Sequence, residues 1–151
     1  ACGGEDAKPA QADLSGKVGE KITTGQYEIT VPSVKARNAV GGAFLSEKPA
    51  EGGVFVVVHF SSKNTTSKPI SSYELPSIKL IDPNNVSYDN ATGAAAAYAG
   101  EANLDTKAFS DLNPGITQKD ADVFEVSREL WNKPGWKIMV DADKDIAITV
   151  K

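Results

Sequence analysis

The sequence is poor in the residues from which most catalytic and metal sites are built. Its 151 residues include one histidine, one cysteine and one methionine. A transition-metal site needs several His or Cys ligands, and much acid–base catalysis relies on histidine. The chain also has no phosphate-binding glycine loop of the G-x-x-x-x-G-K-[ST] or G-x-G-x-x-G type and no G-x-S-x-G nucleophile elbow. We therefore expect neither an enzyme activity nor a cofactor.

Long hydrophobic runs and an excess of positive charge are also absent. The longest bulky apolar run is 54–58, far shorter than the roughly 20 residues of a membrane-spanning helix. Lys and Arg number 16 against 20 Asp and Glu, which gives a net charge of −4. Because phosphate contacts need a basic surface, this balance argues against a nucleic-acid partner. The length and the 40% hydrophobic content suit one globular domain.

The single cysteine stands at the start of the chain, in Ala1-Cys2-Gly3-Gly4. This arrangement resembles the processing site of a bacterial lipoprotein, where a small residue precedes the cysteine that becomes lipidated. The resemblance implies that a signal peptide has been removed and that Cys2 is the lipid attachment site, the protein's one link to a membrane. The alternative is an unmodified cysteine in a secreted or periplasmic protein.

We expect residues 1–16 to form a flexible tether of the lipoprotein type. Residues 5–16 are mainly small or polar, and Leu14 is their one large apolar side chain. Such a segment buries too little apolar surface to order itself. The folded domain is therefore predicted to begin near Lys17 and to comprise residues 17–151.

Short strand-like runs alternate with turn signals throughout the predicted domain. The predicted strands are 18–22, 26–37, 54–64, 77–81, 86–89, 117–127, 136–140 and 146–150. Residues 38–53 are predicted to form a long Gly- and Pro-containing loop, 94–102 a short alanine-rich helix and 128–132 one helical turn. This pattern predicts an all-β sandwich of seven or eight strands with one short helix insertion.

Two of these strands carry more specific signals. Pro32 cannot donate a ladder hydrogen bond, and Val34 resumes the apolar face one residue out of phase, so a bulge is expected there. The run 54–64 is apolar on both faces as far as His59, which predicts a central strand covered on both sides. We expect Val56, Val58 and Phe60 on its core face.

An ordered set of phrases carries a resemblance to a known family. They are 18–22 (VGEKI), 27–31 (YEITV), 53–60 (GVFVVVHF) with Lys63-Asn64, 112–115 (LNPG) and 123–126 (VFEV). The set resembles a large family of bacterial secreted proteins and lipoproteins of unknown function, to which the secreted immunoprotective antigen of mycobacteria is related. The resemblance implies an immunoglobulin-like fold outside the cytoplasm and supplies no catalytic residues. The sequence departs from the family pattern at the alanine-rich segment 94–102.

Three carboxylates have the spacing of a calcium loop. Asp141, Asp143 and Asp145 alternate as the first ligands of such a loop do. Ile146, however, stands where an EF-hand needs glycine, and its twelfth position lies beyond Lys151. We therefore favour an acidic turn between two strands and predict no metal site.

Other polar candidates have similar structural explanations. Asp120 and Asp122 share one strand face and could pair as acid and base, but a solvated strand face has the same pattern. His59 is interpreted as a packed strand residue, because a triad needs partners that the sequence does not identify.

Aromatic and loop residues give the best binding candidates. Trp131 and Trp136 flank a turn, where they either form a stacking surface for a ligand or plug one end of the sandwich. Phe44 and Leu45 in the loop 38–53 are a possible interaction site, because long loops on rigid sandwiches often carry binding. We therefore expect a protein-interaction module of the bacterial cell envelope with an unknown protein partner. The alternative is a small-ligand or calcium-binding extracytoplasmic protein.

Overall fold

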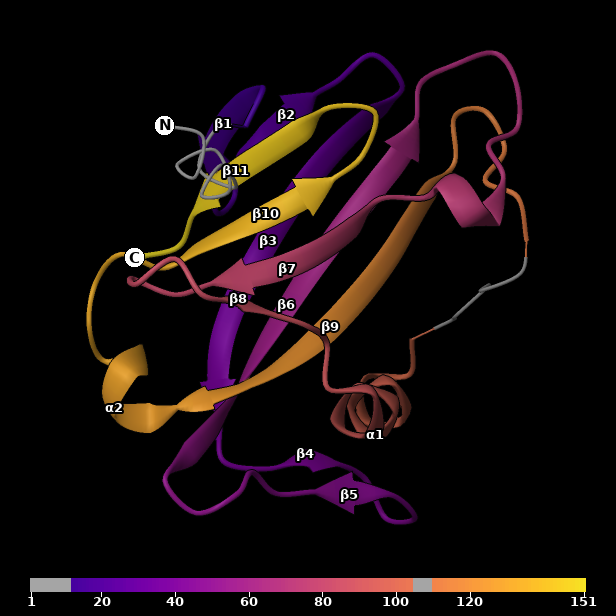
Figure 1. Ribbon diagram of the computed structural model, residues 1–151. Coiled ribbons are helices and arrows are strands. Elements are labelled where there is room, and N and C mark those ends of the chain that lie inside the picture. Colours follow the sequence, from indigo (N-terminus) through magenta and orange to yellow (C-terminus); the bar gives the residue numbers. More distant parts are fainter. Residues whose placement is uncertain (1–11, 105–109) are drawn as a thin grey trace.

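Two β-sheets face each other and make up most of the structure (Figure 1). The computed structural model describes residues 12–104 and 110–151. The first sheet has the spatial order β1 (Leu14–Lys17), β11 (Asp145–Thr149), β10 (Lys137–Asp141), β7 (Ser77–Ile81) and β8 (Ser87–Tyr88). The second has the order β2 (Lys21–Thr23), β3 (Tyr27–Arg37), β6 (Gly53–Asn64) and β9 (Thr117–Ser127). The predicted immunoglobulin-like β-sandwich is confirmed.

Smaller elements surround the two sheets. β4 (Val40–Gly41) and β5 (Ser46–Glu47) form a short hairpin, and η2 (Ser72–Glu74) is one turn of 3-10 helix. The predicted helical segments are α1 (Thr92–Ala102) and α2 (Arg128–Trp131). None of the helices within the described ranges has the length and hydrophobicity needed to cross a membrane.

Strand β6 is central and buried on both faces, as predicted. It pairs antiparallel with β3 on one side and with β9 on the other. One face carries Val56, Val58 and Phe60 into the core between the sheets, together with Phe124 and Val126 of β9. The opposite face is covered separately by α1 and β4. There, Phe55, Val57 and Val123 pack with Val40, Ala94 and Ala97.

The bulge expected near Pro32 is also present. The pairing of β3 with β6 shifts register between Thr30 and Ser33. Proline has no N–H to give to the ladder, so the extra residue is accommodated where a hydrogen bond would be lost in any case.

The domain begins earlier than its predicted start near Lys17. β1 runs from Leu14 and pairs parallel with β11, with Leu14 opposite Ile146. Leu14 packs against the core, and this pairing adds hydrogen bonds along the edge of β11. A parallel pair between segments about 130 residues apart leaves no local sequence signal. Residues 1–11, and with them the expected lipidation at Cys2, lie outside the described residues.

Three further expectations need smaller corrections. The chain turns at Gly19, whose positive φ of 90° favours glycine, so the first predicted strand shrinks to β2. The expected loop 38–53 contains the β4–β5 pair, with Val40 buried in its base. The short strands β1, β4 and β5 are additional to the eight predicted strands, so the described residues contain eleven strands.

Asn64 joins three chain segments at the end of β6. Its side chain is fully buried and donates hydrogen bonds to the carbonyls of Lys68 and Leu112, both at 2.8 Å. Its Oδ1 accepts from the backbone N–H and the hydroxyl of Thr66, at 2.8 and 2.7 Å. The Asn64 backbone also bonds to Gly115 and Ile116. A single amide therefore fixes the turn after β6 and the turn before β9.

Replacement of this amide is expected to destabilise the domain. Asn64→Ala leaves two carbonyls and two Thr66 donors without their partner, which should lower the free energy of unfolding by about 3 kcal/mol. Urea denaturation measures the change. Asn84→Ala is the matched control, because Asn84 is exposed at a turn. Equal stabilities of the two variants would contradict the assigned role.

Candidate functional site

The β4–β5 hairpin presents two bare apolar side chains. Phe44 is fully exposed and Leu45 is 52% exposed. Gly41 closes the hairpin at a positive φ of 121°, and a Cβ there would lie 2.2 Å from the Leu45 carbonyl oxygen. Gly41 is therefore needed for the tight turn that projects Phe44 and Leu45 into solvent.

The base of the hairpin is held by α1. The Gly41 N–H donates to Glu101 Oε1 at 2.9 Å, and Arg37 Nη2 lies 3.0 Å from Glu101 Oε2. The Gly41 hydrogen bond, together with Arg37, lowers the pKa of the Glu101 carboxyl. The hairpin tip, formed by Phe44 and Leu45, therefore projects from a base that is held in place by α1.

His59 belongs to the same packed region. Its Nε2 lies 2.7 Å from the Tyr98 hydroxyl of α1, and the two rings meet edge to face. Burial lowers the pKa of His59, and the charge of Lys35 lowers it further. The structure therefore supports the interpretation of His59 as a packed strand residue, which contacts Tyr98 and helps to hold α1 against β6. Sequence reasoning did not identify Tyr98, because the partner comes from a distant helix.

Trp131 and Trp136 meet at one end of the sandwich. Their ring centroids are 5.0 Å apart at an interplanar angle of 60°. Trp136 is 1% exposed and donates from Nε1 to the Leu130 carbonyl, and the Lys151 ammonium lies 4.5 Å from the centre of the Trp131 ring. This geometry matches an end plug, and the buried Trp136 has no ring face to offer a ligand.

Of the three aspartates of the last hairpin, Asp143 uses its carboxylate in hydrogen bonds to the β2–β3 turn. Asp141 and Asp145 are opposite each other in the β10–β11 pair, and the Asp145 N–H donates to Asp13. Asp143 accepts from the Thr24 hydroxyl at 2.7 Å and from the Gln26 N–H at 3.1 Å. Asp143 thus ties this turn to the β2–β3 turn. No cluster of three or more His, Cys, Asp or Glu suited to a metal ion occurs within 12–104 and 110–151.

Asp120 and Asp122 depart from the expected solvated strand face. By strand alternation they share the face of β9 that carries Phe124 and Val126 into the core. Burial raises the pKa of Asp122 to about 6, and the neighbouring Asp120 charge adds to the effect. Burial also raises the pKa of Asp120, although a long hydrogen bond from Gln118 opposes this. These carboxylates are half-buried because they continue a core-facing row.

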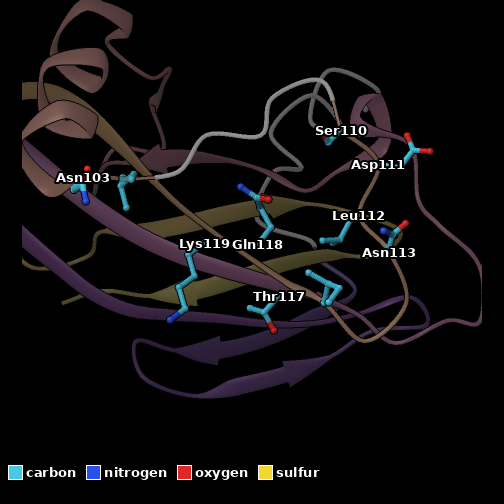
Figure 2. A pocket seen from close by; sticks show the side chains of 10 residues that line it. Asn103, Ser110, Asp111, Leu112, Asn113, Thr117, Gln118 and Lys119 are labelled. Carbon is cyan, nitrogen blue, oxygen red and sulfur yellow. The ribbon is translucent and has the colours of Figure 1, made fainter.

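Two cavities lie along the outer edge of β9. One of about 300 Å³ is lined by Asp120, Asp122, Leu75 and alanines of α1. The other, of about 660 Å³, is lined by Thr117, Gln118 and Lys119 of β9 and by residues on either side of the 105–109 segment (Figure 2). Leu104 and Gln118 line both cavities, so the two adjoin.

These features define a class of protein: an immunoglobulin-like β-sandwich with a helical insertion and an apolar hairpin tip. The chain belongs to the family of the domain of unknown function DUF4352, whose model matches residues 16–130. It is 36% identical over 140 residues to the uncharacterized protein YxkC of Bacillus subtilis, covering 92% of this chain and 78% of that protein.

Solved structures show the same fold. A conserved hypothetical protein from Bacillus anthracis aligns with a TM-score of 0.77 and 28% identity, over 88% of this chain and 94% of that one. An uncharacterized beta-sandwich protein from Clostridium difficile aligns with a TM-score of 0.60 and 18% identity, over 93% and 96% of the two chains. No activity is indicated by these relatives. The expected links to the mycobacterial antigen and to lipoproteins stay predictions.

The half-buried Asp122 predicts a pH-dependent stability. Its pKa is higher in the folded chain than in the unfolded chain, so the folded state binds more protons between about pH 4 and 6 and loses stability as the pH rises. Asp122→Asn should remove this loss and raise the free energy of unfolding at pH 7 by about 2 kcal/mol.

Urea denaturation at pH 4, 5, 6 and 7 measures the effect. Asp141→Asn is the control, because Asp141 is an exposed carboxylate at the end of β10. If the Asp122→Asn and Asp141→Asn variants show the same pH dependence, Asp122 is not the buried acid that the geometry indicates.

Proposed function

We propose that the protein is a non-enzymatic lipoprotein of the bacterial cell envelope that binds another envelope protein through its β4–β5 hairpin. The observation that carries the proposal is the full exposure of Phe44 beside Leu45. Two adjacent apolar side chains at a projecting tip are unfavourable in water, and they become favourable when a partner buries them. Aromatic side chains also dominate the energetics of many protein interfaces.

The contacts at the base of the hairpin favour a binding role for Phe44 and Leu45 over incidental exposure in an irregular loop. Glu101 holds the Gly41 amide, and Val40 is buried against α1 and β6. A pre-anchored loop loses less conformational entropy on binding than a free one. The proposed partner surface is an apolar pocket that takes the Phe44 ring.

Site-specific photocrosslinking in the producing bacterium tests the hairpin. A photoreactive residue at position 44 should yield a discrete adduct with one envelope protein, because the tip inserts into that partner. Leu45→Asp, which places a charge in the interface, should abolish it. The control position is Val86, an apolar residue at the β7–β8 turn that is 49% exposed. Adducts that are the same at positions 44 and 86, or none at 44, would contradict the proposal.

The lipid anchor has an independent test. Mass spectrometry of the protein from its native membrane fraction should find an N-terminal peptide that begins at Cys2 and carries two or three acyl chains. At least two chains are needed for stable anchoring. Cys2→Ser should move the protein from the detergent phase to the aqueous phase. An unmodified Cys2 peptide from wild-type protein would remove the anchor from the proposal and leave a secreted or periplasmic domain.

A further inference from the structure

Strand β9 is an edge strand that is only partly covered. Its inner side pairs with β6. On its outer side, the Val123 N–H donates to Asn90 Oδ1 at 3.0 Å, and the Val123 carbonyl accepts from the Ala91 N–H at 2.7 Å. In an antiparallel pair the backbone groups of alternate residues point the same way. The N–H and C=O groups of Lys119 and Ala121 therefore point outward as well.

The outward groups of Lys119 and Ala121 are open within the described chain. No backbone hydrogen bond among residues 12–104 and 110–151 reaches them. An edge of this kind is a template for one more strand. Many peptide-binding domains use such an edge, because the ladder hydrogen bonds supply affinity whatever the sequence of the added strand.

The two adjoining cavities extend along this open stretch. Between them they are lined by every β9 residue from Thr117 to Asp122. Figure 2 shows the side chains of Gln118 and Lys119 projecting to opposite sides of β9. Asp120 and Asp122 lie on the Gln118 side by alternation. An added strand would therefore place alternate side chains next to these two carboxylates.

The carboxylates lack a positive partner in the described part of the chain. The salt bridges found there involve other acidic residues, and the one side-chain hydrogen bond to this pair is the long Gln118–Asp120 contact of 3.4 Å. The smaller cavity combines this negative charge with the methyl groups of Ala95, Ala96 and Ala99. A long basic side chain matches both features, because it has an aliphatic stem and a cationic end.

We propose that the open edge of β9 binds an extended segment of another protein as an additional strand. A Lys or Arg side chain of that segment enters the cavity beside Asp120 and Asp122. This surface is separate from the hairpin tip, so the inference goes beyond the proposed function. Failure at either surface leaves the other intact.

The experiment uses two synthetic peptides and amide-resolved NMR. The probe is a capped hexapeptide of alternating Thr and Val with one central Lys, and its matched control has norleucine in place of Lys. The Lys peptide, at millimolar concentration, should shift the amide signals of residues 117–122 and slow hydrogen exchange at Lys119 and Ala121. The norleucine peptide should bind at least about tenfold more weakly, because it forms no charge-assisted hydrogen bond.

Substitutions distinguish the contribution of the two carboxylates to peptide binding from that of the backbone edge of β9. Asp120→Asn/Asp122→Asn should reduce affinity for the Lys peptide about tenfold without unfolding the domain, since both substitutions remove a half-buried charge. Asp141→Asn and Phe44→Ala should bind as wild type does. The norleucine peptide should bind equally to all these variants.

Several results would overturn the inference. One is no binding of the Lys peptide, and another is equal binding of the Lys and norleucine peptides. A third is protection of the Lys119 and Ala121 amides in the free protein, which would mean that the chain itself occupies the edge. A loss of binding in Phe44→Ala would transfer the contact to the hairpin tip.

Discussion

The burial of β6 on both faces is the constraint on which the rest of the structure depends. A strand with Val56 and Val58 on one side and Phe55 and Val57 on the other cannot leave either side in water. The second sheet covers one face. The other face requires α1 and the base of the β4–β5 hairpin, which explains why an alanine-rich helix with little packing area of its own is kept in place.

Polar side chains fix the connections around this core. Asn64 ties the turns at the ends of β6 and β9, Asp143 ties two neighbouring turns, and the buried Asp82 accepts from two backbone amides and the Tyr88 hydroxyl. No buried side-chain N or O atom in the described chain lacks a hydrogen-bond partner. Against this background Asp120 and Asp122 are exceptional, because they are half-buried carboxylates whose one side-chain hydrogen bond in the described chain is the 3.4 Å contact from Gln118 to Asp120.

The parts of the fold that were predictable from sequence are those with strong local patterns. The two-faced run of β6, the bulge at Pro32 and the bounds of β9, Thr117–Ser127, all follow from alternation and from proline chemistry. The start of β1 could not be predicted from the sequence, because its pairing with β11 is a long-range contact. The half-buried position of Asp122, by contrast, follows from alternation, which places Asp122 on the core-facing side of β9 with Phe124 and Val126. The charged side chain masked this signal, because a carboxylate is normally expected on a solvated face.

Helix α1 connects the two proposed binding surfaces. Its Glu101 holds the hairpin through Gly41, and its Ala95, Ala96 and Ala99 line the cavity beside β9. Figure 1 shows the helix lying next to both the β4–β5 hairpin and β9. This segment is also where the sequence is expected to depart from the pattern of the family that it resembles. The sandwich core determines the fold, whereas α1 positions the base of the hairpin and lines the smaller cavity beside β9. Differences in binding between members of the family are therefore expected to arise from this helix.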